Sequence, residues 1–240
     1  MQSKKLIKIS TFIVGISVLS FGLWYLDPLD FFDNNTISLK VQTKTPAIPP
    51  EENGNGENLE NTSTSEPFAE LTIPYLRKQG FESSIGDLNE VSRKEGYISY
   101  LTSYSSGDLQ INGLLTKPTA EMMPRSGWPA IIFIHGYIPP QQYRTRERYE
   151  AYVDYLARKK FVVFKIDLRG HGDSEGNPGG AYYSSDYIVD TLSAYSALQS
   201  LEFVDPERIG LWGHSMGGNI ILRALTVNTE IPSAVIWAGT

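Results

Sequence analysis

The chain has 240 residues, of which 41% are apolar, 12% aromatic and 20% charged, enough for one sizeable hydrophobic core and some additional segments. Its formal net charge of −6 and the lack of a basic tract after the first eight residues argue against binding to nucleic acid. The absence of cysteine excludes disulfides, thiolate catalysis and cysteine-ligated metal, and it leaves the redox compartment open.

Residues 1–32 have the pattern of a membrane anchor. Three lysines precede residues 9–26, which carry no charge, and three aspartates come after them. A stretch of this length can cross a bilayer, and its basic flank predicts a cytoplasmic N-terminus with the rest of the chain outside. We expect an uncleaved signal anchor, because the apolar stretch is long and shows no clean Ala-x-Ala cleavage site. The alternative is a cleaved signal peptide and a secreted protein.

Residues 33–67 differ sharply in composition from the segments on either side. They contain no aromatic residue and are rich in Asn, Thr, Ser, Pro and Glu. Since such a segment buries too little apolar surface to offset the entropy of ordering it, we expect a disordered tether. It would hold the folded domain, residues 68–240, away from the membrane.

The first folded residues predict strands. Residues 71–93 give mixed signals, but residues 97–104 and 109–116 alternate apolar and polar side chains on either side of a Ser-Ser-Gly-Asp turn, which indicates a β-hairpin. Residues 130–134 are apolar on both faces, as expected of a central parallel strand.

Helical and strand patterns alternate in the next part of the chain. Apolar residues at helical spacing predict one helix over about residues 146–159 and a second around residues 188–198. A strand is expected at residues 161–166, and Asp205-Pro206 is expected to turn the chain before the next strand.

The residues immediately after the strand at 161–166 include types that bind metals. Asp167, His171 and Asp173 lie within the sequence Asp-Leu-Arg-Gly-His-Gly-Asp-Ser. No regular face would make the three side chains converge, so we expect no metal site here.

Residues 208–222 carry the most informative pattern. A short apolar run leads into Gly-x-Ser-x-Gly, centred on Ser215, and an apolar segment at helical spacing comes next. A strand that turns directly into a helix holds the serine hydroxyl clear of the sheet, and Gly213 and Gly217 flank it because a Cβ would crowd the turn. The turn also leaves the backbone N–H of Met216 free to donate to a developing oxyanion. Ser215 is therefore the candidate nucleophile.

Residues 205–218, Asp-Pro-Glu-Arg-Ile-Gly-Leu-Trp-Gly-His-Ser-Met-Gly-Gly, resemble the α/β-hydrolase fold. Within that fold the sequence is most similar to the catalytic domains of the prolyl-oligopeptidase (S9) and dienelactone-hydrolase group. The resemblance implies a mostly parallel sheet with helices on both faces, opened by an antiparallel hairpin.

The resemblance also implies roles for the residues after the strand at 130–134. His135-Gly136 would lead into an oxyanion loop, in which Tyr137 offers its backbone N–H beside that of Met216. His135 is interpreted as a packing residue that holds this turn rather than as a proton carrier. The Asp-x-Arg-Gly-His-Gly-x-Ser run would be a structural loop beside the site.

The resembling family needs an acid and a histidine after the serine in chain order. The chain has three histidines, His135, His171 and His214, and all precede Ser215. A serine hydroxyl without an adjacent base is a weak nucleophile. We therefore expect the base and its carboxylate partner to lie beyond Thr240, in a domain that is incomplete here and lacks its last strands.

The sequence thus predicts a membrane-tethered, extracytoplasmic serine hydrolase that cleaves an amide or ester bond through an acyl-enzyme on Ser215. No metal or organic cofactor is implied. A peptide or another small molecule would be the substrate, with a peptidase favoured over an esterase or lipase. The rival hypothesis is a non-catalytic binding protein that uses the same fold.

Overall fold

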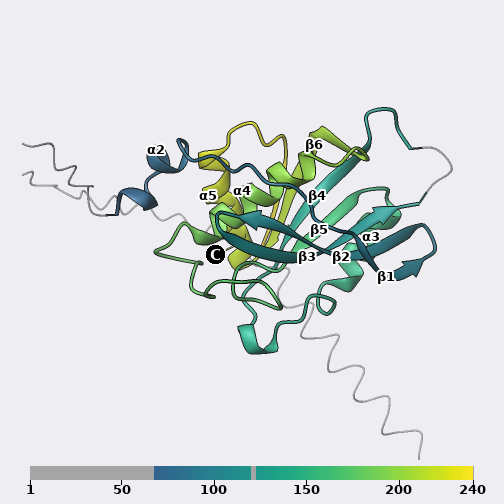
Figure 1. Cartoon of the computed structure of the whole chain (residues 1–240), viewed down its shortest axis with the longest axis horizontal. Helices are drawn as coiled ribbons and strands as arrows, with labels where there is room; N and C mark the ends of the chain where they lie inside the picture. Colours follow the sequence, from purple (N-terminus) through teal and green to yellow (C-terminus); the bar gives the residue numbers. More distant parts are fainter. Residues whose placement is uncertain (1–67, 120–122, 240) are drawn as a thin grey trace, which may run out of the picture. The chain divides into compact units, whose positions relative to one another are not determined.

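The computed structural model describes residues 68–119 and 123–239 (Figure 1). The predicted membrane anchor at residues 1–32 and the predicted tether at residues 33–67 lie outside these described ranges. Within the ranges, no helix is both long and apolar enough to cross a bilayer.

A mixed sheet of seven strands organises the described residues, in the order β1-β2-β3-β5-β4-β6-β7 (Figure 1). Strands β5, β4, β6 and β7 run parallel to one another, whereas β1, β2 and β3 are paired antiparallel and β3 is antiparallel to β5. Their bounds are β1 Asn89–Lys94, β2 Tyr97–Ser106, β3 Leu109–Pro118, β4 Trp128–Ile134, β5 Val162–Ile166, β6 Val204–His214 and β7 Ala234–Trp237. The carboxyl ends of the parallel strands therefore meet at one edge of the sheet.

The predicted hairpin is confirmed as β2 and β3, which pair from Tyr97↔Pro118 to Ser106↔Leu109. The preceding strand β1 was not predicted. Its side chains are exposed or only half-buried, and they include Glu90, Arg93 and Lys94. Because β1 has no buried face, its sequence lacks the apolar alternation by which a strand is recognised.

Helices cover both faces of the sheet, as the resemblance implied. Helices α4 (Asp186–Gln199) and α5 (Met216–Val227) pack over the larger core, whereas α3 (Glu150–Arg158) packs over a smaller cluster that contains Phe133 and Val163. Adjacent residues of β4 alternate between the two sides, since Ile132 belongs to the larger cluster. The short helices are η1 Ala69–Leu71, α2 Ile73–Leu76 and η2 Pro140–Gln142.

Two predicted boundaries were wrong. Helix α3 begins at Glu150 rather than near residue 146, because Arg148 (φ 63°) and Tyr149 (φ 55°) adopt left-handed backbone conformations that a helix cannot contain. The turn at Asp205-Pro206 does not precede β6 but lies inside it. Strand β4 pairs with β6 at Val204 and again only at Ile209, so the intervening residues bulge out of the ladder.

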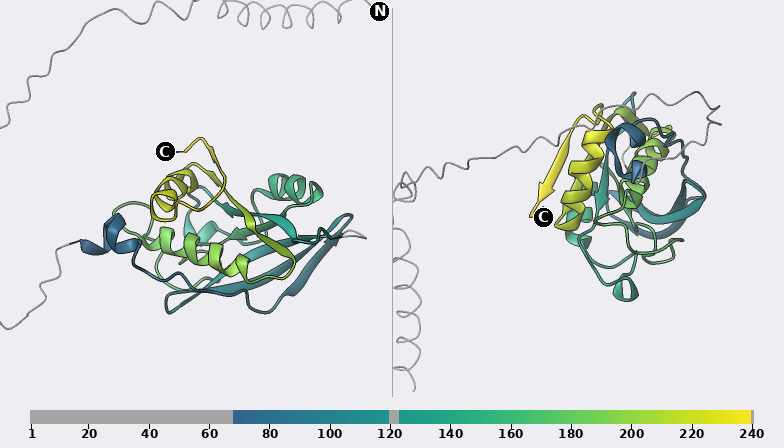
Figure 2. Two further views of the ribbon diagram at one scale, coloured as in Figure 1. Left: turned by 90° about the horizontal axis from the view of Figure 1, so that it is seen from above. Right: turned by 90° about the vertical axis from the view of Figure 1, so that its left-hand side faces the viewer.

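Strand β7 forms one edge of the sheet and runs beside α5 (Figure 2, right). Its apolar side chains remain accessible: Val235 is 52% exposed, Ile236 38% and Trp237 44%. Exposed strand edges present unpaired backbone groups as well as side chains. This edge strand therefore presents exposed apolar side chains.

Candidate active site

Ser215 lies at the junction between β6 and α5. Its backbone has φ 51° and ψ −118°, a combination that non-glycine residues rarely adopt. The Ser215 N–H donates to the Trp237 carbonyl of β7 (3.0 Å), and the Ser215 carbonyl accepts from the N–H of Gly218 (2.8 Å). The side chain is half-buried. The junction thus holds a strained serine in place from both sides while leaving it partly accessible.

The two glycines that flank the serine permit a very close approach of backbones. A Cβ at Gly213 would lie 2.6 Å from the backbone of Gly217, and a Cβ at Gly217 would collide with the carbonyl oxygen of Ile134. Since both obstacles are backbone, they cannot move aside as a flexible side chain would. The sharp turn at Ser215 therefore depends on glycine at both positions.

The register of the parallel strands brings the segment after β4 to this junction. Ile134, the last residue of β4, pairs with Gly213 of β6. The turn after β4 contains Gly136, where a Cβ would lie 2.8 Å from His214 Nδ1, so this turn and the Ser215 junction are in contact. Tyr137 comes next and has a side chain that is 70% exposed. The segment predicted to form an oxyanion loop thus lies beside the candidate nucleophile.

Met216 is the first residue of α5, and its side chain is 4% exposed. The N–H groups of a helix's first turn have no partner within the helix, and the Met216 N–H is one of them. A positive helix N-terminus also favours a developing negative charge.

Tyr149 bridges the two segments, a role that the sequence did not reveal. The Gly136 N–H donates to the Tyr149 hydroxyl oxygen (2.9 Å), and this hydroxyl lies 2.9 Å from His214 Nδ1. Because its oxygen already accepts from Gly136, the hydroxyl has its own proton to donate to the histidine. Burial raises the pKa of the Tyr149 hydroxyl, so that proton is retained at neutral pH. Tyr149 was predicted only as part of an apolar helix face.

Replacing Tyr149 with phenylalanine is expected to destabilise the fold by about 1–3 kcal/mol, because the Gly136 N–H is left without a partner. Urea unfolding would measure this change. Tyr155→Phe is the matched control, since its side chain is 61% exposed on α3, the helix that follows Tyr149, and it should change the free energy of unfolding by less than about 0.5 kcal/mol. Equal stabilities of the two variants would contradict the bridging role.

His135 is fully buried, and both of its ring nitrogens face backbone carbonyls. Nδ1 lies 2.8 Å from the Gly136 oxygen and Nε2 lies 3.3 Å from the Asp167 oxygen. Burial lowers the pKa of His135 to about 3, so the ring is neutral at physiological pH. This environment agrees with the interpretation of His135 as a residue that holds the turn.

Asp167 ties the loop after β5 to the loop after β4. The buried carboxylate accepts hydrogen bonds from Tyr143 (2.7 Å) and Thr145 (2.5 Å). Burial raises the pKa of Asp167 to about 6, although both hydrogen bonds act against the increase. Tyr143, an aromatic residue in the predicted oxyanion loop, is itself fully buried and so packs against Asp167 rather than facing solvent.

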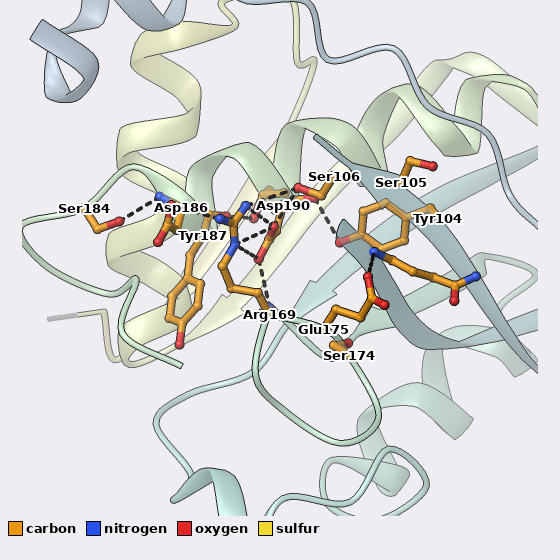
Figure 3. A network of polar contacts seen from close by, with 12 residues as sticks. Tyr104, Ser105, Ser106, Arg169, Ser174, Glu175, Ser184, Asp186, Tyr187 and Asp190 are labelled. Atoms are coloured by element: carbon orange, nitrogen blue, oxygen red, sulfur yellow. Dashed lines mark hydrogen bonds and ion pairs between the residues drawn. The ribbon is translucent and has the colours of Figure 1, made fainter. Parts of the chain in front are cut away.

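A second buried carboxylate, that of Asp190, also binds the loop after β5 (Figure 3). Asp190 of α4 is fully buried and pairs with the Arg169 guanidinium (2.7 Å), and it also accepts from the Arg169 backbone N–H (2.9 Å) and from the Ser106 hydroxyl (2.7 Å). Arg169 further contacts Asp186 at 2.9 Å. The Asp-x-Arg-Gly-His-Gly-x-Ser loop is thus held to α4 and β2 by a connected polar network.

Two buried groups affect the pH dependence of stability in opposite directions. Between its folded pKa of about 3 and its ordinary value of 6.5, His135 binds a proton only in the unfolded chain, so stability rises with pH. Between its ordinary value of 3.8 and its folded pKa of about 6, Asp167 binds a proton mainly in the folded state, so stability falls as pH rises.

Asp167→Asn is therefore expected to steepen the increase in stability between about pH 4 and pH 6, because only the opposing contribution is removed. Urea unfolding across this range would measure the slope. Asp87→Asn, at an exposed position, is the control that should leave the slope unchanged. A slope that Asp167→Asn leaves unaltered or makes shallower would contradict the assignment.

The hydrogen bonds of the three histidines lead to groups other than the Ser215 hydroxyl. Within the described residues, no hydrogen bond links the Ser215 hydroxyl to a ring nitrogen of His135, His171 or His214. His171 Nδ1 instead lies 3.2 Å from the Arg169 carbonyl oxygen. The described ranges also contain no cluster of three potential metal-binding side chains.

Comparison with known proteins places the chain in a class. Residues 129–240 match the family model described as serine aminopeptidase, S33. The chain is 29% identical over 133 residues to the quorum-quenching protein AidA of Acinetobacter baumannii, covering 55% of this chain and 41% of AidA. It is 30% identical over 141 residues to the uncharacterized peptidase YtmA of Bacillus subtilis, covering 58% of this chain and 51% of YtmA. The chain thus spans about half or less of the length of these curated relatives.

Solved structures of hydrolases also superpose on this chain. Acetyl xylan esterase 1 from Thermoanaerobacterium superposes with a TM-score of 0.53 at 20% identity, covering 69% of this chain and 58% of the esterase. Dipeptidyl peptidase 4 from Porphyromonas gingivalis superposes with a TM-score of 0.51 at 27% identity, covering 60% of this chain and 21% of the peptidase. The sheet order, the strand-to-helix junction at Ser215 and these matches show the α/β-hydrolase fold. The sequence resemblance had indicated the same fold.

Proposed function

We propose that the protein is a serine hydrolase with Ser215 as its nucleophile. The observation that carries the proposal is the strained, half-buried serine between β6 and α5, flanked by glycines that allow no side chain. Strain of this kind persists only where the surrounding structure enforces it, and it is common at catalytic residues. The S33 family model that spans this region adds support.

In the proposed reaction the Ser215 oxygen attacks an ester or amide carbonyl, and a base accepts the hydroxyl proton. The backbone N–H groups of Tyr137 and Met216 stabilise the negative charge that develops on the carbonyl oxygen. The bond to the leaving alcohol or amine then breaks, the leaving group takes up a proton, and an acyl-enzyme forms. Water releases the acid and regenerates the serine.

In this proposal the general base is none of the three histidines that precede Ser215. We propose that a histidine and an acidic residue beyond Thr240 complete the site, in the order that α/β hydrolases use. A fluorophosphonate probe applied to the protein from its natural source, followed by peptide mapping, tests the nucleophile. Modification of Ser215 is expected, and a folded protein that remains unlabelled would reject the proposal.

The proposed substrate is a peptide or a small ester. The relatives include a protein described as a peptidase and an acetyl xylan esterase, so both bond types occur among similar proteins. We favour amide hydrolysis of the S9 kind, in line with the resemblance of residues 205–218. Hydrolysis rates on a panel of aminoacyl amides and short acyl esters would decide between the two bond types. Faster hydrolysis of the esters throughout the panel would contradict the preference for amides.

A non-catalytic binding protein is the alternative; the observation that favours it is that, within the described residues, the histidine hydrogen bonds lead to groups other than the Ser215 hydroxyl. It predicts that Ser215→Ala changes nothing measurable in the cell. The serine hydrolase predicts loss of function while the variant stays folded.

For location, we propose a single-pass membrane protein with an extracytoplasmic domain. The support is the lysine-flanked, uncharged stretch at residues 9–26. Protease added to intact cells should digest the domain and leave a cytoplasmic control protein intact. Recovery of the full domain in the culture medium would instead indicate signal cleavage.

A further inference from the structure

A cavity of about 240 Å³ lies away from Ser215, between β1, β2, β3, β5 and the start of α3. Its charged lining is mostly basic: Lys94, Arg146, Arg148 and Lys165, against the single acid Glu150. Hydroxyl groups of Ser92 and Ser99 also line it. A concave site with several cations and hydroxyl donors has the composition that binds oxyanions.

Lys165 is the distinctive member of this lining. Its side chain, on β5, is 1% exposed, and its ammonium donates to the Glu147 carbonyl (2.7 Å) and lies 3.5 Å from the Arg148 carbonyl. Within the part of the chain that the structure describes, Lys165 forms no ion pair with a carboxylate. A buried charge without a counterion is costly, and an ammonium has three N–H donors.

The nearby carboxylates do not neutralise the cavity. Glu147, Glu150 and Asp167 raise the pKa of Lys165, but burial outweighs them and lowers it to about 8, so the ammonium stays mostly charged at neutral pH. Lys94 has its own partner, Asp154, at 3.9 Å. Within the described residues Lys165 thus has no ion-pair partner, and besides the two carbonyls its ammonium faces the Tyr143 ring, whose centroid lies 5.7 Å away.

We propose that this cavity binds a phosphate-type oxyanion, free or as the terminal group of a small organic molecule, with Lys165 as its buried anchor. The anion would accept a hydrogen bond from the remaining N–H of Lys165. Arg146 and Arg148 would bind it from the outer side. Both arginines are exposed in the segment just before α3, so they can contact a ligand without leaving a buried charge behind. The site is independent of the proposed reaction at Ser215.

Isothermal titration of the full chain with inorganic phosphate, glycerol 3-phosphate and glycerol tests the proposal. Binding of both phosphates but not of glycerol is expected. Tighter binding of glycerol 3-phosphate would identify an organic phosphate as the ligand, whereas tighter binding of inorganic phosphate would identify the free ion. Absence of binding by either phosphate at about 10 mM, a concentration at which even weak specific sites fill, would overturn the proposal.

Variants locate the binding. Lys165→Met should abolish it, and the double variant Arg146→Gln/Arg148→Gln, which alters only exposed side chains, should weaken it by about tenfold or more. Arg125→Gln removes one exposed charge outside the cavity and should leave affinity unchanged. If Lys165→Met does not fold, the affinity of the double variant still tests whether the anion binds in this cavity. Unchanged affinity in the double variant would place the anion elsewhere and refute the proposal.

Discussion

Replacing Ser215 with alanine is expected to abolish labelling by a fluorophosphonate probe and to lower hydrolysis by at least about a thousandfold. The reason is that the hydroxyl is the only group at the β6–α5 junction that the proposed reaction consumes and regenerates. The fold should be preserved, because the hydroxyl that alanine removes is only half-buried. Labelling and turnover on the substrate panel would measure the effect.

The control is Ser84→Ala, at an exposed position far along the chain from the junction, which should keep full labelling and turnover. Circular dichroism of both variants would establish that each is folded. A Ser215→Ala protein that retains hydrolysis would remove Ser215 from the reaction, and the α/β-hydrolase fold would then serve a different chemistry or a binding role.

Replacing Asp190 with alanine is expected to destabilise the fold by about 3–5 kcal/mol. The change removes the carboxylate that pairs with Arg169 and accepts from Ser106, and it leaves a guanidinium side chain that is only 13% exposed without its closest partner. Removing one partner of a buried ion pair lowers the free energy of unfolding by more than the intact pair contributes to it, because the remaining charge stays buried away from water.

Asp186→Ala provides the matched comparison, since Asp186 contacts the same arginine at 2.9 Å from a side chain that is 45% exposed. A solvent-exposed ion pair contributes no more than about 1 kcal/mol. Urea unfolding of the two variants would therefore differ by several kcal/mol. Similar losses would mean that burial does not govern this network.

Several elements were predictable because their signals are local. The hairpin of β2 and β3 results from alternating side chains and a short turn, and β4 from an apolar run on both faces. The junction at Ser215 is indicated by glycine spacing, since the close contacts that require Gly213 and Gly217 arise around the turn itself. The helices on the two faces of the sheet were predicted from the periodicity of their apolar residues.

Other features depend on contacts between distant segments. The start of α3 was misplaced because Lys165, in another strand, bonds to the carbonyls of Glu147 and Arg148 just before the helix, where two residues are left-handed. The bridge from Tyr149 to Gly136 and His214 joins three segments, and no short pattern encodes it. Likewise, Lys165 stands within an apolar run, and the sequence alone does not show that a cavity lies beside it.

Trp237 gives the protein a built-in optical reporter. Its carbonyl accepts the Ser215 N–H, its ring lies 4.7 Å from the His214 ring, and its side chain is 44% exposed on the edge strand. An indole that is half in water emits at longer wavelength than a buried one. An occupant of the site that covers this ring should therefore shift the contribution of Trp237, one of four tryptophans in the chain, to shorter wavelength, without any attached dye.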